Sequence, residues 1–303
     1  MSSKAARAYI LLSIAAALIT MGLKFGAYQL TASVGLFSDM AESSVNLIAA
    51  IAAFWALTVA AQPPDKEHTF GHSKAEYFSS GLEGFLILVA ATSIALTAIP
   101  RLVDPQPIED IELGLGLSII ASLVNGGVAM IMLRAGKRLR SITLRAEAHH
   151  LLSDVWTSVG VVAGLVIVKL TGWLILDPLM AVLVAVHIAW VAIELLGETM
   201  SGFMDRALPD EDQTVIRAIL TAYQTQGIQF HALRTRVAGA RNFVSFHVLV
   251  PGNWSVQKGH KLCDILEQSI MTAVPGTHVM THLEPLEDPM SWADAELDRA
   301  HNP

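Results

Sequence analysis

Two polar stripes interrupt long apolar segments of this chain, one between residues 35 and 61 and the other between residues 146 and 169. Helical spacing places the members of each stripe on one face, because residues three, four and seven apart lie on the same side of a helix. The stripes are Asp39, Glu42, Ser43 and Asn46 in the earlier segment, and Glu147, His150 and Asp154 in the later one. Two neighbouring helices could turn these groups toward each other.

The side chains in the stripes are of the types that bind divalent transition metals. Such ions take about four ligands in a compact shell, drawn from carboxylates, amide oxygens and imidazoles. An ionisable side chain near the centre of a bilayer costs about 2.5 to 3.5 kcal/mol and usually marks a functional site. The alternative is hydrogen bonding between helices, and Asn46 taken alone is more typical of that role.

Composition places the chain in a membrane. The 303 residues are 53% hydrophobic and 16% charged, and the mean hydropathy is +0.50, which is above that of ordinary soluble domains. The net charge of -7, together with the lack of a basic, aromatic-rich pattern, argues against nucleic-acid binding. The single cysteine, Cys263, excludes an intrachain disulfide framework.

Six segments are long enough to cross about 30 Å of hydrocarbon as helices. They lie near residues 8–30, 35–61, 78–100, 113–133, 146–169 and 176–200. Lys and Arg gather before the first segment and in the links after the second and fourth, whereas the remaining links carry few basic residues. Because cytoplasmic loops are rich in Lys and Arg, we expect a multi-pass protein of the inner (cytoplasmic) membrane with both termini in the cytoplasm.

A small soluble domain should follow the sixth span. The pattern predicts a helix to about residue 223, strands over 231–237 and 242–250 joined by a turn at 239–242, a helix over 255–273 and a strand over 277–284. The expected fold class is thus an all-α membrane domain of six transmembrane helices followed by a cytoplasmic α+β domain of αββαβ order, ferredoxin-like or metallochaperone-like. The predicted limits are 1–206 for the transport domain, 207–290 for the cytoplasmic domain and 291–303 for a flexible tail.

Jointly these features resemble the cation diffusion facilitator family, the proton-coupled efflux carriers of zinc, iron and related divalent ions. The resemblance covers nearly the whole chain. It rests on six spans with an αββαβ tail, on His150 and Asp154 in the fifth span, and on the segment DKEHTFGHSKAE at residues 65–76. The segment DRALP at residues 205–209 and the histidines of the tail add to it.

The resemblance implies a transport site made of Glu42, Asn46, His150 and Asp154. Members of the zinc and iron branch usually carry Asp or His at the position of Glu42 and Asp at that of Asn46, so this chain departs from the pattern. With His150 neutral, the ionised quartet carries two negative charges, which balance one divalent ion. Its three oxygen groups make Fe²⁺, Co²⁺, Ni²⁺ and Mn²⁺ candidates beside Zn²⁺. A register shifted by three would use Asp39 and Ser43 instead.

Proton exchange should drive the export. Only a neutral imidazole binds a metal, so proton and metal compete at His150. We expect alternating access, in which deprotonated His150 and Asp154 load the ion from the cytoplasm and protons displace it on the other side. Metal ions and protons are the expected partners, with the ion as substrate and regulator and without a catalytic cofactor.

Two features belong to the link after the second span. Asp65, His68 and His72 form a three-ligand cluster, and helical spacing would put both histidines on one face. The resemblance implies a metal site there, and the alternative is a solvated loop. Lys74 and Asp205 resemble the family's charge interlock between this link and the end of the sixth span. An exposed pair contributes under about 1 kcal/mol, so its importance would require partial burial.

Strand alternation places several potential ligands of the tail on one face of its sheet. The resemblance implies a cytoplasmic binuclear metal site near a homodimer interface, with the ligands His231, His247, His260, His282 and Glu284. His278 is an additional candidate. For any one of these residues alone, the alternative is a hydrogen-bonded polar group on a sheet.

Two other classes compete with a carrier: a membrane metalloenzyme and a metal sensor that does not transport. The sequence has no His-Glu-x-x-His, nucleophile elbow or phosphate loop, so we do not expect an enzyme. Two residues within the spans stay open. Lys24 either faces the bundle or extends to the interface, and His187 is expected to be a hydrogen-bonded helix residue.

Overall fold

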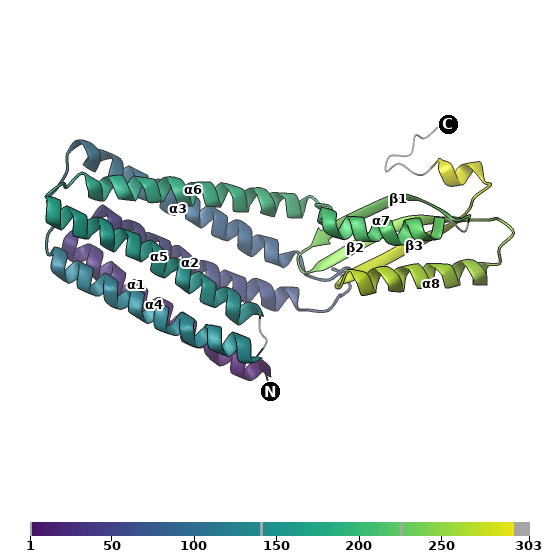
Figure 1. Cartoon of the computed structure of the whole chain (residues 1–303), viewed down its shortest axis with the longest axis horizontal. Helices are drawn as coiled ribbons and strands as arrows, with labels where there is room; N and C mark the ends of the chain where they lie inside the picture. Colours follow the sequence, from purple (N-terminus) through teal and green to yellow (C-terminus); the bar gives the residue numbers. More distant parts are fainter. Residues whose placement is uncertain (1, 140–141, 225–226, 294–303) are drawn as a thin grey trace. The chain divides into compact units, whose positions relative to one another are not determined.

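The computed structural model describes residues 2–139, 142–224 and 227–293 (Figure 1). Within this part of the chain the membrane helices are α1 (Ser2–Thr31), α2 (Val34–Ala60), α3 (Ala75–Val103), α4 (Ile111–Leu139), α5 (Ile142–Thr171) and α6 (Leu176–Phe203). The domain that follows α6, called the tail from here on, contains α7 (Asp210–Gln224), β1 (Gln229–Ala238), β2 (Arg241–Val250), α8 (Val256–Ala273), β3 (Thr277–Pro285) and the short helix η1 (Pro289–Trp292). The chain clusters into two compact units, Met1–Ala56 with Ser79–Gly197, and Leu57–Phe78 with Glu198–Pro303.

The first six helices are long and apolar enough to cross a membrane, which confirms the six predicted spans. Their outer faces carry large exposed apolar side chains, such as Trp156 and Trp190. Such faces suit contact with lipid, because a helix satisfies its backbone hydrogen bonds internally and needs no water.

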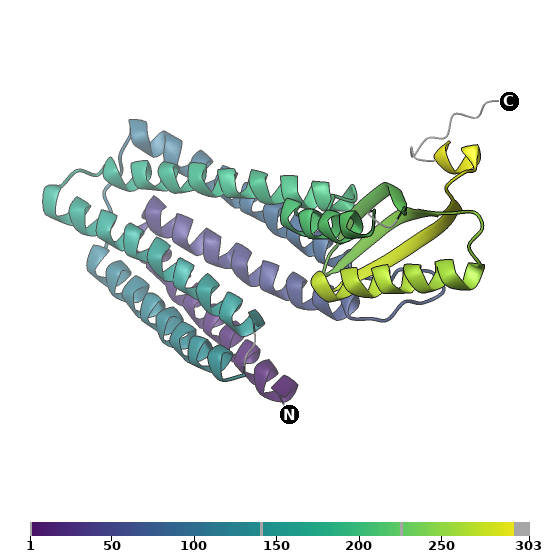
Figure 2. The same ribbon diagram turned by 45° about the vertical axis from the view of Figure 1, so that its right-hand side comes forward.

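Small residues let the helices of the first unit approach closely. In both views α1, α4 and α5 run side by side (Figures 1 and 2), and Ala16, Ala129 and Ala148 are buried between them. A further cluster joins α1, α2 and α5 through buried apolar side chains that include Leu36 and Leu165. The two polar stripes of the sequence therefore lie on neighbouring helices.

The start of α2 is fixed by a carboxylate from α6. The Asp177 oxygens accept hydrogen bonds from the backbone N–H groups of Val34 at 2.8 Å and Gly35 at 3.1 Å, and from the Ser33 hydroxyl at 2.6 Å. A Cβ added at Gly35 would lie 2.9 Å from Asp177 Oδ1, so the close approach requires glycine. A carboxylate satisfies the unpaired N–H groups at a helix start, and here it also fixes the position of the helix that carries the earlier stripe.

The tail forms a three-stranded sheet in the order β1-β2-β3, with β1 and β2 antiparallel and β2 and β3 parallel. The predicted αββαβ order is confirmed. Val244, Phe246 and Val248 of β2 are buried in the core that α7 and α8 complete. Since side chains alternate along a strand, His247 points to the opposite face. The helices thus cover one face of the sheet, and the other face presents histidine.

Candidate metal-binding sites

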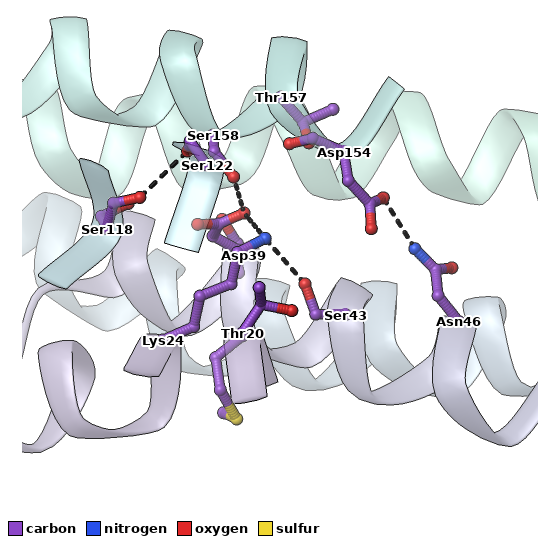
Figure 3. Close-up of polar contacts among 12 residues, drawn as sticks. Thr20, Lys24, Asp39, Ser43, Asn46, Ser118, Ser122, Asp154, Thr157 and Ser158 are labelled. Carbon is purple, nitrogen blue, oxygen red and sulfur yellow. Dashed lines mark hydrogen bonds and ion pairs between the residues drawn. The ribbon is translucent and has the colours of Figure 1, made fainter. Parts of the chain in front are cut away.

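The two stripes meet at one hydrogen bond in the membrane bundle. Asn46 Nδ2 of α2 donates to Asp154 Oδ1 of α5 at 2.9 Å (Figure 3). Asp154 is buried and Asn46 is partly buried. Because the amide is neutral, this contact orients the carboxylate without cancelling its charge.

A cavity of about 250 Å³ opens beside this pair. Glu42 lines it together with Asn46 and Asp154, so three of the four predicted transport ligands share one polar space. Two further ionisable side chains line the same cavity, Glu83 from α3 and His187 from α6. Sequence reasoning missed Glu83, although a carboxylate within the third span is the kind of signal that could have found it.

The structure describes the backbone but not the side chains of two members of the later stripe, Glu147 and His150. The role expected of His150 therefore stays a prediction. The backbone of α5 is described there, and it places position 150 about one helical turn before Asp154.

The other end of the earlier stripe is occupied by a lysine. Lys24, with 1% of its side chain exposed, donates from Nζ to Asp39 Oδ1 at 2.8 Å and to Ser43 Oγ at 2.7 Å (Figure 3). The Ser158 hydroxyl of α5 donates to the same Asp39 oxygen at 2.8 Å. Of the two orientations left open for Lys24, the one that faces the bundle is correct. The sequence signal was a lysine in the middle of an apolar span.

In the second unit, the ligand atoms of Asp65, His68 and His72 lie within 4.8 Å of one another. Asp65 Oδ1 accepts the backbone N–H of His68 at 2.7 Å, and Asp65 Oδ2 lies 3.3 Å from His72 Nε2. The backbone hydrogen bond from His68 lowers the pKa of Asp65, which favours the ionised, metal-binding form. Residues 61–74 are turns, bends and irregular backbone, so the fold of this loop, and not helical spacing, brings the two histidines together.

The turn at Gly71, with a φ of 86°, brings the two histidine rings to a centroid distance of 4.4 Å. A Cβ added at Gly71 would lie 2.8 Å from Arg241 Nη1, so both the backbone and the space favour glycine. Arg241 Nη1 donates to the Phe70 carbonyl oxygen at 3.2 Å. The start of β2 thereby holds the loop that carries the cluster.

The expected partners Lys74 and Asp205 are in contact, with Lys74 Nζ 2.8 Å from Asp205 Oδ1. Arg236 of β1, which sequence reasoning missed, donates to the same oxygen at 3.1 Å. Lys74 and Arg236 lower the pKa of Asp205, Lys74 more strongly. Both side chains of the Lys74–Asp205 pair are more than one third exposed, so solvent weakens the attraction.

The sheet of the tail aligns three histidines across its three strands. The register pairs His231 with His247, and His247 with His282. A bulge after His231, where Ala232 has a φ of 51°, shifts the pairing of β1 with β2. Bulges commonly re-aim a side chain at a site.

Glu284 joins this row from β3. Its Oε2 lies 3.0 Å from His231 Nε2 and 3.3 Å from His247 Nδ1, and its Oε1 lies 3.4 Å from His282 Nε2. Glu284, His231 and His247 form a three-ligand group, and the carboxylate is buried. His282 stands at the exposed edge of the group, so the structure brings four of the five predicted tail ligands together.

Two predicted residues lie elsewhere in the second unit. Nε2 of His260 on α8 is 3.6 Å from Asp264 Oδ2, and both side chains are exposed. A Cβ added at Gly259 of α8 would contact Leu283, so α8 covers the face opposite His282. His278 stacks on Phe243 with ring centroids 5.6 Å apart. The described contacts therefore place neither His260 nor His278 in the group around Glu284.

Comparisons with known proteins cover nearly the whole chain. A family model of the cation efflux transmembrane domain matches residues 10–204, and one of the cation efflux protein cytoplasmic domain matches residues 208–286. An uncharacterized transporter of Synechocystis is 55% identical over 292 residues, which are 96% of this chain and 94% of that protein. The cation-efflux pump FieF of Klebsiella pneumoniae is 31% identical over 264 residues, 87% of each chain. A solved structure of CzrB in its Zn form is 40% identical and covers 27% of this chain and 93% of that chain, with a TM-score of 0.26.

Proposed function

Because this chain belongs to the cation diffusion facilitator family, whose members transport divalent metals and are not enzymes, we propose that it exports a divalent transition metal ion in exchange for protons. The observation that carries the proposal is the meeting of Asn46 and Asp154, beside Glu42, at a polar cavity in an apolar helix bundle. An ion that crosses the bundle needs such a set of ligands midway.

The proposed transport site consists of Glu42, Asn46, His150 and Asp154. When both carboxylates are ionised and the imidazole is neutral, the site carries two negative charges and balances one divalent ion. Three of its four ligand groups are hard oxygen donors, which suits Fe²⁺, Co²⁺, Ni²⁺ and Mn²⁺ as well as Zn²⁺.

The contacts of Lys24 favour this set over the shifted register. Asp39 and Ser43 both accept hydrogen bonds from Lys24 Nζ, so a metal ion at Asp39 would meet a positive charge already in place. Asp154 contacts a neutral amide instead. Repulsion from the ammonium group therefore argues against Asp39 and Ser43 as ligands.

Proton exchange supplies the driving force in this proposal. Moving a doubly charged ion outward against 100 mV costs about 4.6 kcal/mol, at about 2.3 kcal/mol for each charge, and each returning proton offsets half of it. Metal binding requires deprotonated ligands. Protons arriving from outside would therefore displace the ion from His150 and Asp154 and reset the carrier for loading from the cytoplasm.

We also propose a regulatory role for the tail, taken as residues 207–290. The group around Glu284 and the loop cluster around Asp65 each bring three possible ligand atoms within 4.8 Å of one another. In a homodimer within the inner membrane, with both termini in the cytoplasm, metal at these sites would report the cytoplasmic concentration. His260 lies on α8, which covers the face of the sheet opposite His282, so we expect it to act as a metal ligand only in the dimer. Removing the residues after Pro209 should then abolish the metal dependence and lower the dimer content.

The test is transport by the purified full-length chain in proteoliposomes. Zn²⁺, Fe²⁺, Co²⁺, Ni²⁺, Mn²⁺ and Cd²⁺ are supplied in parallel, with and without an imposed pH gradient. We expect saturable accumulation that falls when the gradient is collapsed. If the metal flux does not change when the pH gradient is collapsed, the proposed exchange for protons is wrong. Saturable metal binding without flux would favour a sensor that does not transport.

A further inference from the structure

A second, much smaller cavity adjoins the Asn46–Asp154 pair on the side of α1 and α4. Its volume is about 30 Å³. Apolar side chains form part of its wall, and its polar lining comes from Ser13, Thr20, Ser43, Asn46, Asn125 and Asp154. The proposed transport residues thus border two spaces, a wide one toward α3 and α6 and a narrow one toward α1 and α4.

Asn125 of α4 is the unexplained residue of the narrow cavity. It is 2% exposed, and its Oδ1 is buried without a hydrogen-bond partner among the residues that the structure describes. A buried carbonyl oxygen without a partner is unfavourable. Asn125 therefore has an unused acceptor at the wall of the cavity.

The chemistry of the lining selects a positively charged occupant. The Asn125 oxygen only accepts hydrogen bonds, and so does an ionised Asp154. The Ser43 hydroxyl oxygen is already occupied by the hydrogen bond from Lys24 Nζ at 2.7 Å, so it is not counted as a ligand. The acceptors that the cavity offers to an ion are therefore the Asn125 amide oxygen of α4 and the Asp154 carboxylate of α5.

The size of the cavity limits the occupant to a small species. One water needs about 10 to 15 Å³ by the same measure, so about 30 Å³ holds at most two or three waters, or one ion that has lost most of its hydration shell. Oxygen ligands in a tight shell suit small, hard divalent ions better than soft ones.

From these observations we propose that Asn125 Oδ1 is a further ligand of the transported ion. The narrow cavity takes the ion after it has lost most of its water, and α4 thereby contributes to the choice of metal. This inference rests on the proposed function, since it deepens the site around Asp154. We therefore expect Asn125 to favour ions that prefer oxygen ligands, such as Mn²⁺ and Fe²⁺, over the softer Cd²⁺.

The experiment compares Asn125→Leu, which removes the oxygen at similar volume, with Asn125→Asp, which keeps an oxygen and adds charge. Ser118→Ala is the matched control, because Ser118 is also buried on α4 with an unpartnered oxygen in the described chain but lines neither cavity. Full-length proteins are reconstituted, and the KM values for Mn²⁺ and Cd²⁺ are measured. Equilibrium Mn²⁺ binding is followed by electron paramagnetic resonance in a His72→Ala, His231→Ala background, which removes ligands from the two outer clusters.

We expect Asn125→Leu to raise the KM for Mn²⁺ at least about tenfold, as loss of a group that supports a metal does, with a much smaller change for Cd²⁺. Asn125→Asp should tighten Mn²⁺ binding, and Ser118→Ala should match the original chain. Equal KM values in Asn125→Leu and the original chain would mean that the cavity holds only water, and the inference fails. If Asn125→Leu does not fold, unchanged Mn²⁺ affinity in Asn125→Asp overturns it equally. The original chain could also prove to transport no metal while Asn125→Leu still binds Mn²⁺ more weakly than the original chain does. In that case Asn125 is a metal ligand, and the proposed carrier function is wrong.

Discussion

Asp39 and Asp154 are both buried carboxylates on facing helices of the bundle, yet their surroundings are opposite. Asp39 accepts hydrogen bonds from a lysine ammonium and a serine hydroxyl, and it lines neither of the two cavities described above. Asp154 contacts a neutral amide and lines both. A carboxylate that is paired with a fixed cation and lines neither cavity belongs to the scaffold, whereas one that lines both cavities is positioned to receive an ion.

Burial does not separate these two residues, because Asp39 is 2% exposed and Asp154 is 7% exposed. Their contacts and their place beside the cavities separate them: Asp39 accepts from an ammonium group, whereas Asp154 accepts from an amide and lines both cavities. Substitutions at these two residues and at their partners test the difference.

The largest effect is expected from Asp154→Ala. It removes the carboxylate that borders both cavities, so metal transport in proteoliposomes should fall by more than about 100-fold, the upper range for lost metal-site groups. Thr157→Ala, one turn along the wall of the wide cavity, is the control and should retain most of the rate. Normal transport by Asp154→Ala would mean that the central ligand has been misassigned.

Lys24→Met should act on stability instead. It leaves the Asp39 charge buried without a cation, and breaking a buried pair in this way typically costs about 3 to 5 kcal/mol. Thermal or denaturant unfolding in detergent measures the loss.

The double variant Lys24→Met, Asp39→Leu tests whether Asp39 has a role beyond its pairing with Lys24. Replacing both members of a buried pair by apolar groups is often close to neutral, so stability and most of the transport should return. A double variant that is stable but inactive would instead make Asp39 a ligand and favour the shifted register.

Asn46→Asp should change the choice of metal. The new carboxylate faces Asp154 where the Asn46 amide now donates at 2.9 Å, and two carboxylates so close need a proton or a metal between them. We expect stronger proton competition and a change of about tenfold, equivalent to about 1.4 kcal/mol, in the ratio of KM values for Zn²⁺ and Mn²⁺. Ser44→Ala, also on α2 but in neither cavity, should leave that ratio unchanged. An unaltered selectivity order would contradict the charge argument.

The exposed pair Lys74–Asp205 provides the smallest effect and a useful contrast to Lys24–Asp39. Asp205→Asn should lower the free energy of unfolding by less than about 1 kcal/mol at neutral pH. The folded pKa of Asp205 is depressed, so its contribution is present above the unfolded pKa of about 3.9 and is lost as the pH falls through the folded value. Unfolding curves of the two proteins should therefore converge in acid. A difference that persists there would assign the effect to something other than the ion pair.

The sequence predicted the elements well because their signals are periodic. Six apolar stretches of spanning length and a period of two in the tail strands identified the fold class. His68 and His72 lie in a loop, where a spacing of four residues does not fix how the two rings are placed. Their approach accompanies the turn at Gly71, beside which Arg241 donates to the Phe70 carbonyl oxygen.

The site was predictable as a set of residue types but not as a set of partners. Glu42, Asn46 and Asp154 could be selected because polar groups in a span are costly. The rotation and offset of the helices decide which stripe residue contacts Lys24. They also decide that Asn125 lines the narrow cavity and Glu83 the wide one, each together with Asp154. Helical spacing places Asp39 and Ser43 on the same face as Glu42 and Asn46, so the sequence pattern left the alternative of Asp39 and Ser43 open.

The sequence alone determined that this chain spans a membrane six times, carries an αββαβ tail and holds carboxylate, amide and imidazole groups within its spans. Those properties follow from composition and period, which act locally along the chain. Tertiary structure decided which of two buried carboxylates is paired with a lysine and which lines the two cavities. That outcome depends on a cation from another helix, Lys24, which Coulomb attraction and hydrogen-bond geometry pair with Asp39 and not with Asp154.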